Sequence, residues 1–226
     1  MSYDWNFHRL VPYVHAFVAG AMTTLSLTLI VVAVGTLLGF LLGLLMRDAI
    51  LRLVLYPFVD VIRAVPPLVL LLFLYYALTE QVIGTAVTAF WVAAIGLSLN
   101  LAAFVADLVR AAVESVDPDS TDAGRALGMS ERHVTRHIVL PHVVREITPG
   151  LTVLYIGILK TTSLAAVISV REVVYAAETV IADVSRSLEA WTVVAAIYIV
   201  LVLPATYGAR AVERHLGRGR VQERSV

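Results

Sequence analysis

The sequence predicts an all-α integral membrane protein, a single domain over residues 1–226 with five transmembrane helices. The chain is 59% hydrophobic, and only 15% of its residues are charged. Its mean hydropathy is +0.86. A soluble domain is about half apolar and a quarter charged, so this chain has too little polar material to cover a surface in water. Five apolar segments reach the length of about 20 residues that a helix needs to cross a bilayer.

The first predicted span covers about residues 18–46 and contains no charged residue. Gly35, Gly39 and Gly43 recur within it at every fourth position. Small residues at this spacing let two membrane helices approach closely, so we expect a packing seam on this face. Glycine is also common in membrane helices generally, which is the alternative explanation.

The second predicted span, about residues 53–78, is interrupted by Asp60, Arg63 and the pair Pro66–Pro67. Charged groups at membrane depth are costly, and each one is therefore a candidate for function. Asp60 and Arg63 lie three residues apart on one helical face, where they are close enough to pair. We interpret them as a structural ion pair that steadies the helix before the prolines.

The remaining predicted spans cover about residues 85–112, 138–168 and 190–208. The third has Asn100 near its middle, and the fourth has Lys160 towards its outer half. Both side chains are candidates for contact with a transported solute. Asn100 is equally suited to tie two helices together, and Lys160 to extend its ammonium group towards the membrane surface.

The distribution of arginine predicts the orientation of the chain in the membrane. Cytoplasmic segments of membrane proteins carry an excess of Lys and Arg. One side collects most of the arginines, from two loops and the tail: Arg47, Arg52, Arg110, Arg125, Arg132, Arg136, Arg210, Arg214, Arg218, Arg220 and Arg224. The other side has Arg9, Arg171 and Arg186. We therefore expect the N-terminus outside and the C-terminus in the cytoplasm.

The loop of about residues 114–137, between the third and fourth spans, is predicted to contain a short exposed helix. Pro118 is suited to open it, with Asp117 as its N-cap, and Gly128 to end it in a left-handed conformation. Its surface is formed by small residues, which would fit a groove on another protein. Periodicity alone is equally compatible with a plain connecting loop.

This loop resembles the EAA loop of permeases in ATP-binding-cassette (ABC) importers. Asp122-Ala123-Gly124 is followed by Gly128 and then by Ile138-Val139-Leu140-Pro141, with the spacing of that motif intact. The departures are Asp for Glu and Gly for the second Ala. We call residues 114–137 the coupling loop.

Other segments are similar to the polar amino acid branch of that family. They are Asp60-Val-Ile-Arg63-Ala-Val-Pro66, Leu97-Ser98-Leu99-Asn100, Glu114-Ser115-Val116 and Leu159-Lys160-Thr161-Thr162-Ser163-Leu164. The resemblance covers about residues 23–216. It implies the type I importer permease fold, multi-pass in a bacterial inner membrane, and uptake of a polar amino acid or an amino-acid-like solute such as an osmolyte or an opine.

The resemblance also implies a set of partners. They are an ATPase dimer, a second permease subunit (identical or paralogous), an extracytoplasmic solute-binding protein and the membrane lipid. The ATPase is expected to grip the helix at Asp122–Gly128. The residues expected to couple the chain to the ATPase are Asp122, Ala123, Gly124, Leu127, Gly128, Met129 and Pro141. The chain lacks a Gly-x-x-x-x-Gly-Lys-Ser/Thr loop, so ATP and magnesium are expected on the ATPase and no cofactor on this chain.

The same resemblance, with the cost of polar groups in the membrane, predicts a solute pathway. Its residues are Ser98, Asn100, Lys160, Thr161, Thr162 and Ser163. A Lys ammonium beside three hydroxyl groups is suited to the carboxylate that every amino acid carries. Many relatives have Asp at the position of Thr161, and its absence argues against a cationic solute.

Other function classes are less well supported by the sequence. Zero net charge gives no reason to expect nucleic acid, and the absence of Cys excludes thiolate metal sites. His133 and His137 have the spacing of a two-ligand site, but we interpret them as a solvated helix face, with no metal bound. No nucleophile–base set predicts an enzyme. A membrane scaffold or assembly protein without transport is the alternative function.

Overall fold

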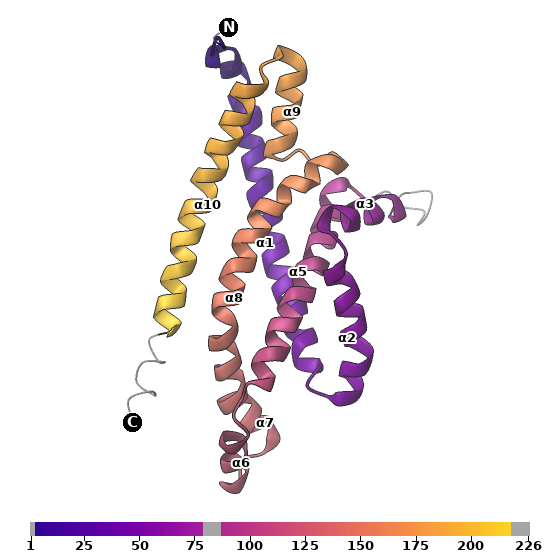
Figure 1. The fold of residues 1–226 in the computed structure, drawn as a ribbon, viewed down its shortest axis with the longest axis vertical. Coiled ribbons are helices and arrows are strands. Elements are labelled where there is room, and N and C mark those ends of the chain that lie inside the picture. Colours follow the sequence, from indigo (N-terminus) through magenta and orange to yellow (C-terminus); the bar gives the residue numbers. More distant parts are fainter. Residues whose placement is uncertain (1–2, 79–86, 218–226) are drawn as a thin grey trace.

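The computed structural model describes residues 3–78 and 87–217, and all regular elements in these ranges are helices. They form an elongated bundle in which α1 (Val14–Leu45), α5 (Ala89–Glu114) and α8 (Leu140–Thr161) run side by side (Figure 1). α10 (Ser187–Gly217) lines one edge. In its most apolar stretch α5 has 72% of its residues buried, against 17% for α10, which makes α5 the central helix.

The predicted glycine seam is confirmed. Gly35, Gly39 and Gly43 are all buried on the face of α1 that packs against α5. A Cβ atom at Gly39 would lie 2.5 Å from the carbonyl oxygen of Ala102, and one at Gly43 would lie 2.5 Å from Cβ of Val109. The absence of side chains at these positions therefore sets how closely the two helices approach.

The predicted second span is broken into two helices. The carboxylate of Asp48 caps α2 (Ala49–Ala64), and α3 (Pro67–Ala77) follows at an angle of 104°. The two prolines cause the break, because a residue before proline is driven to an extended backbone. Val65 has ψ 125° and Pro66 has ψ 137°. The predicted third span begins at residue 85, and its first two residues lie outside the described ranges.

The predicted fourth span contains three successive helical forms. A π-helical turn (η2, Thr135–Val139) leads into α8, and a 3₁₀ helix (η3, Thr162–Ile168) follows it. Pro141 explains the π turn, because its nitrogen has no hydrogen to donate to the preceding turn. The amide of Leu140 donates instead to the carbonyl of Thr135.

A further helix, α9 (Val173–Val184), was not predicted and lies between η3 and α10. It packs against the N-terminal part of α1, the 3₁₀ helix η1 (Phe7–Tyr13) and the start of α10. These elements share a second apolar core, separate from the main core around α5. Within residues 3–78 and 87–217, four helices are long and apolar enough to cross a membrane, or five if α2 and α3 together count as one bent span.

Candidate functional site

The coupling loop folds around the short helix α6 (Pro118–Ala126). The carboxylate of Asp117 accepts a hydrogen bond from the amide of Asp119, and Pro118 occupies the first helical position, both as predicted. At the other end Gly128 has φ +81°. The amide of Gly128 donates to the carbonyl of Arg125, and that of Met129 to the carbonyl of Gly124. This pair of bonds is the Schellman arrangement, which requires a residue with positive φ and so favours glycine.

The small-residue surface of α6 divides between two faces. Gly124 is buried, and a Cβ atom there would lie 2.8 Å from Cδ1 of Ile138 and 3.3 Å from the sulfur of Met129. Leu127 has the opposite environment, with 84% of its surface exposed. Asp122, Ala123, Gly128 and Pro141 are exposed as well. Gly124 and Met129 thus hold the loop together from within, whereas Leu127 projects from it.

An ion-pair cluster fixes the shape of the loop. Arg125 bonds to Asp122 at 2.6 Å within α6 and to Glu131 at 2.6 Å. Glu131 is the first residue of α7 (Glu131–Val134), which the hydroxyl of Ser130 caps. The guanidinium of Arg125 lowers the pKa of the Glu131 carboxyl, so this carboxyl stays ionised at neutral pH.

Two hydrogen bonds join the loop region to the ends of the long helices. The guanidinium of Arg47, after α1, donates to the hydroxyl of Thr135 at 2.8 Å. The hydroxyl of Ser115, after α5, bonds to Nε2 of His142 at 3.0 Å. The rings of His133 and His137 stack 5.6 Å apart. The loop is therefore a folded unit attached to α1, α5 and α8.

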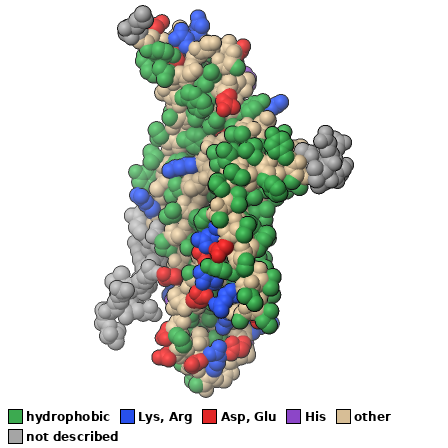
Figure 2. All heavy atoms as spheres, turned by 45° about the vertical axis from the view of Figure 1, so that its right-hand side comes forward, with side chains coloured by type: hydrophobic (Ala, Val, Ile, Leu, Met, Phe, Trp, Pro, Cys, Tyr) green, Lys and Arg blue, Asp and Glu red, His purple; other side chains and the backbone are tan. Residues whose placement is uncertain are grey.

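A chain of six alternating charges links α2 to α5 beside this loop. Each charged group pairs with the next in the series Arg52, Glu114, Arg110, Asp107, Arg63 and Asp60. The N···O distances of these ion pairs are 2.8–3.5 Å. We call this set the ionic ladder. Figure 2 shows acidic and basic side chains intermixed along the lower part of this face. The predicted pair of Asp60 with Arg63 exists at 3.5 Å, but Arg63 lies closer to Asp107 on α5, at 2.9 Å.

The predicted solute residues are only partly brought together. Ser98 and Asn100 are both buried, but they point about 200° apart because they are two residues apart on a helix. The side-chain nitrogen of Asn100 is a buried donor without a partner among the described residues. A group with this property is suited to bind an acceptor oxygen.

Lys160 is exposed, but the three hydroxyl groups after it are turned to the helix backbone. Thr161 donates to the carbonyl of Gly157, Thr162 to that of Leu159, and Ser163 to that of Lys160. Hydroxyl groups bonded in this way accept hydrogen bonds but no longer donate to a carboxylate. The expected set of four donors is therefore reduced to the ammonium of Lys160.

A buried polar cluster at Glu172 was missed by the sequence analysis. This side chain is fully buried at the start of α9. Its carboxylate accepts hydrogen bonds from the amide of Tyr175 and the hydroxyl groups of Thr24 and Tyr198. It thereby joins α1, α9 and α10. In the sequence, this cluster is indicated only by the apolar run after Glu172, which is compatible with a helix. Glu is not a preferred N-cap residue, so the start of that helix at Glu172 was not recognised.

Comparison with known proteins assigns the chain to a protein family. Residues 35–218 match the family described as binding-protein-dependent transport system inner membrane component. The chain belongs to this family. Its members are the membrane components of transport systems and are not enzymes. The family therefore places the chain in the inner membrane.

Individual family members match almost the whole chain. The glutamine transport system permease protein GlnP of Escherichia coli strain K12 is 31% identical over 96% of this chain and 99% of its own length. The arginine transport system permease protein ArtQ of Bacillus subtilis strain 168 is 29% identical, over 93% and 97%. A crystal structure of an amino acid ABC transporter with histidines aligns at a TM-score of 0.84 with 31% identity, over 95% of this chain and 100% of that one.

Proposed function

We propose that this family member is a permease subunit of an ATP-driven importer, and that it takes up a polar amino acid or an amino-acid-like solute. The near-complete alignment with permeases named for glutamine and arginine supports the solute class. The projection of Leu127 from the folded coupling loop supports the assignment of an ATPase partner. A second permease subunit and a solute-binding protein would complete the assembly.

The proposed topology has five spans, with α2 and α3 together as the second one. With five spans, the coupling loop and the tail lie on the same side of the membrane. This side carries most of the arginines, and we assign it to the cytoplasm. The N-terminal segment and α9 then lie outside. An ATPase would reach the coupling loop from the cytoplasm in this orientation, and a binding protein would approach the opposite end.

We assign the ATPase contact to the exposed side of α6, with Leu127 at its centre. The contact would also include Asp122, Ala123 and Gly128, while Gly124 and Met129 shape the loop from within. Pro141 shapes the π turn that leads into α8. Burying a Leu side chain of this exposure in a groove of the partner contributes about 2 kcal/mol. That free energy corresponds to roughly thirtyfold in affinity.

Co-purification of the ATPase with the chain tests this assignment. Leu127→Ser is expected to leave the fold intact, because Leu127 is exposed, and to weaken ATPase binding by roughly thirtyfold. Leu45→Ser, at an exposed position at the end of α1 and outside the coupling loop, is the matched control and should retain the ATPase. Equal retention of the ATPase by the two variants would contradict the proposal, as would a complete lack of an ATPase with the wild-type chain.

We assign the solute carboxylate to Lys160, since its ammonium is the donor left available in that segment. Asn100 is the second proposed contact, through its unpartnered amide nitrogen. Lys160→Ala is expected to abolish uptake in reconstituted vesicles while the ATPase still co-purifies. Wild-type uptake by Lys160→Ala would remove Lys160 from the pathway without touching the assignment of Leu127.

A further inference from the structure

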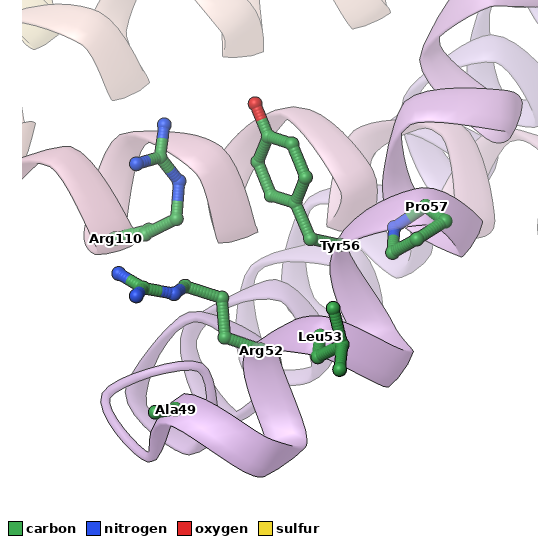
Figure 3. A pocket seen from close by; sticks show the side chains of 6 residues that line it. All are labelled: Ala49, Arg52, Leu53, Tyr56, Pro57 and Arg110. Carbon is green, nitrogen blue, oxygen red and sulfur yellow. The ribbon is translucent and has the colours of Figure 1, made fainter.

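A pocket of about 430 Å³ opens between α2 and α5, near the end of the bundle that bears the coupling loop. It is lined by Ala49, Arg52, Leu53, Tyr56, Pro57 and Arg110. Figure 3 shows Arg52 extending from α2 and Arg110 from α5 towards the same side of the pocket, with the ring of Tyr56 beside Arg110. The pocket thus combines two guanidinium groups with an apolar floor.

The two arginines differ in how many of their donors are already used. Arg110 bonds to Asp107 and to Glu114, and its guanidinium lies 5.1 Å from the centre of the Tyr56 ring. Arg52 directs one terminal nitrogen to Glu114 at 3.2 Å, and its side chain is 50% exposed. A guanidinium has five N–H donors, so within the described residues Arg52 retains donors for a ligand.

The pairing of the two arginines leaves Arg52 as the donor for an anion. Arg110 pairs with both Asp107 and Glu114, whereas Arg52 pairs only with Glu114, whose carboxylate it shares with Arg110. Oδ1 of Asp48 accepts the amides of Ile50 and Leu51 and so caps α2. Arginine matches the oxygens of a phosphate group with two parallel hydrogen bonds.

The position of the pocket matches the headgroup layer of a membrane. Arg52 is in the first turn of α2, and Arg110 is one turn before the end of α5. Beside the pocket, the outward side of α2 presents exposed apolar side chains: Ile50, Leu53, Val54 and Phe58. A phosphate at the arginines would therefore place an attached hydrocarbon chain along an apolar helix face.

We propose that this pocket binds the phosphate of a membrane phospholipid, whose acyl chains lie along the outward face of α2. Basic pockets between helices on the cytoplasmic side of membrane proteins recognise lipid headgroups by this chemistry. The apolar face beside the pocket favours a lipid over a free phosphate, because a free phosphate has no hydrocarbon chain to pack against it. The inference requires that the chain spans a membrane and is independent of the solute and of the ATPase contact.

Thermal unfolding of the full-length chain in detergent tests the proposal. Phosphatidylglycerol is expected to raise the melting temperature saturably, because a ligand that binds the folded state stabilises it by mass action. Phosphatidylethanolamine carries the same phosphate and should also do so. Diacylglycerol, which has the chains without the phosphate, and inorganic phosphate, which lacks the chains, should have no effect at the same concentrations.

Arg52→Gln is expected to weaken phosphatidylglycerol binding by roughly tenfold, the value of a hydrogen bond to a charged group. Arg47→Gln is the matched control, because Arg47 is exposed at the same end of the bundle but does not line the pocket. Equal binding by Arg52→Gln and the wild type would overturn the proposal, as would equal weakening by Arg47→Gln. If Arg52→Gln does not fold, stabilisation of the wild type by diacylglycerol or by inorganic phosphate alone would overturn it.

Discussion

The seam between α1 and α5 gives the most quantitative prediction. Replacing Gly39 with Ala would place a Cβ atom 2.5 Å from the carbonyl oxygen of Ala102 and 2.6 Å from Cβ of Val105. Ordinary van der Waals contact begins at 3.4 Å, so the two helices would have to separate by up to 0.9 Å (3.4 minus 2.5). Overpacking of this kind costs about 1–3 kcal/mol.

The matched control for Gly39→Ala is Gly208→Ala, since nothing lies within 4 Å of a Cβ atom at Gly208 in α10. Both substitutions gain the same preference of Ala over Gly for a helix, about 1 kcal/mol, so their difference isolates the steric cost. Titration with SDS in mixed micelles, followed by the combined fluorescence of Trp5, Trp91 and Trp191, measures the free energy of unfolding. We expect Gly39→Ala to be less stable than Gly208→Ala by about 1–3 kcal/mol. Equal stability of the two variants would refute close packing at Gly39.

Two further predictions concern the coupling loop and the ionic ladder. Gly128→Ala should destabilise the end of α6 by about 1 kcal/mol, because Ala at φ +81° is strained although the space around it is open. Hydrogen exchange at the amide of Met129 should then be roughly fivefold faster, and an unchanged rate would contradict the Schellman cap. In the ladder, Asp107→Asn should cost about 2 kcal/mol and Asp60→Asn less than about 1 kcal/mol, as measured by SDS titration. Asp107 bonds both Arg63 and Arg110 and is 24% exposed, whereas Asp60 is 48% exposed and 3.5 Å from Arg63, so equal costs would contradict the ladder.

Local signals in the sequence predicted the elements well. Apolar length predicted the long helices, glycine spacing predicted the seam on α1, and Asp117, Pro118 and Gly128 predicted both ends of α6. Each of these features depends on residues within a few positions of one another. The same reasoning located the proline break at residues 66–67 but not its angle of 104°, which also depends on how α3 packs against α5.

Features that depend on two distant segments were not predicted. The partner of Arg63 was sought on its own helix, because a single sequence does not reveal that Asp107 lies across from it. Gly124 was assigned to the docking surface, but Ile138 and Met129 cover it. The hydroxyl groups after Lys160 were expected to face a solute, whereas they donate hydrogen bonds to backbone carbonyl groups of the same helical segment.

Uptake of a radiolabelled amino acid into vesicles tests the central proposal most directly. The vesicles would hold this chain with its ATPase, and the solute-binding protein would be added outside together with ATP sealed within. The account predicts ATP-dependent uptake by the wild-type chain and its loss in Leu127→Ser, with Leu45→Ser unaffected. ATP-driven uptake at the wild-type rate by Leu127→Ser would contradict the claim that α6 links this permease to its source of energy.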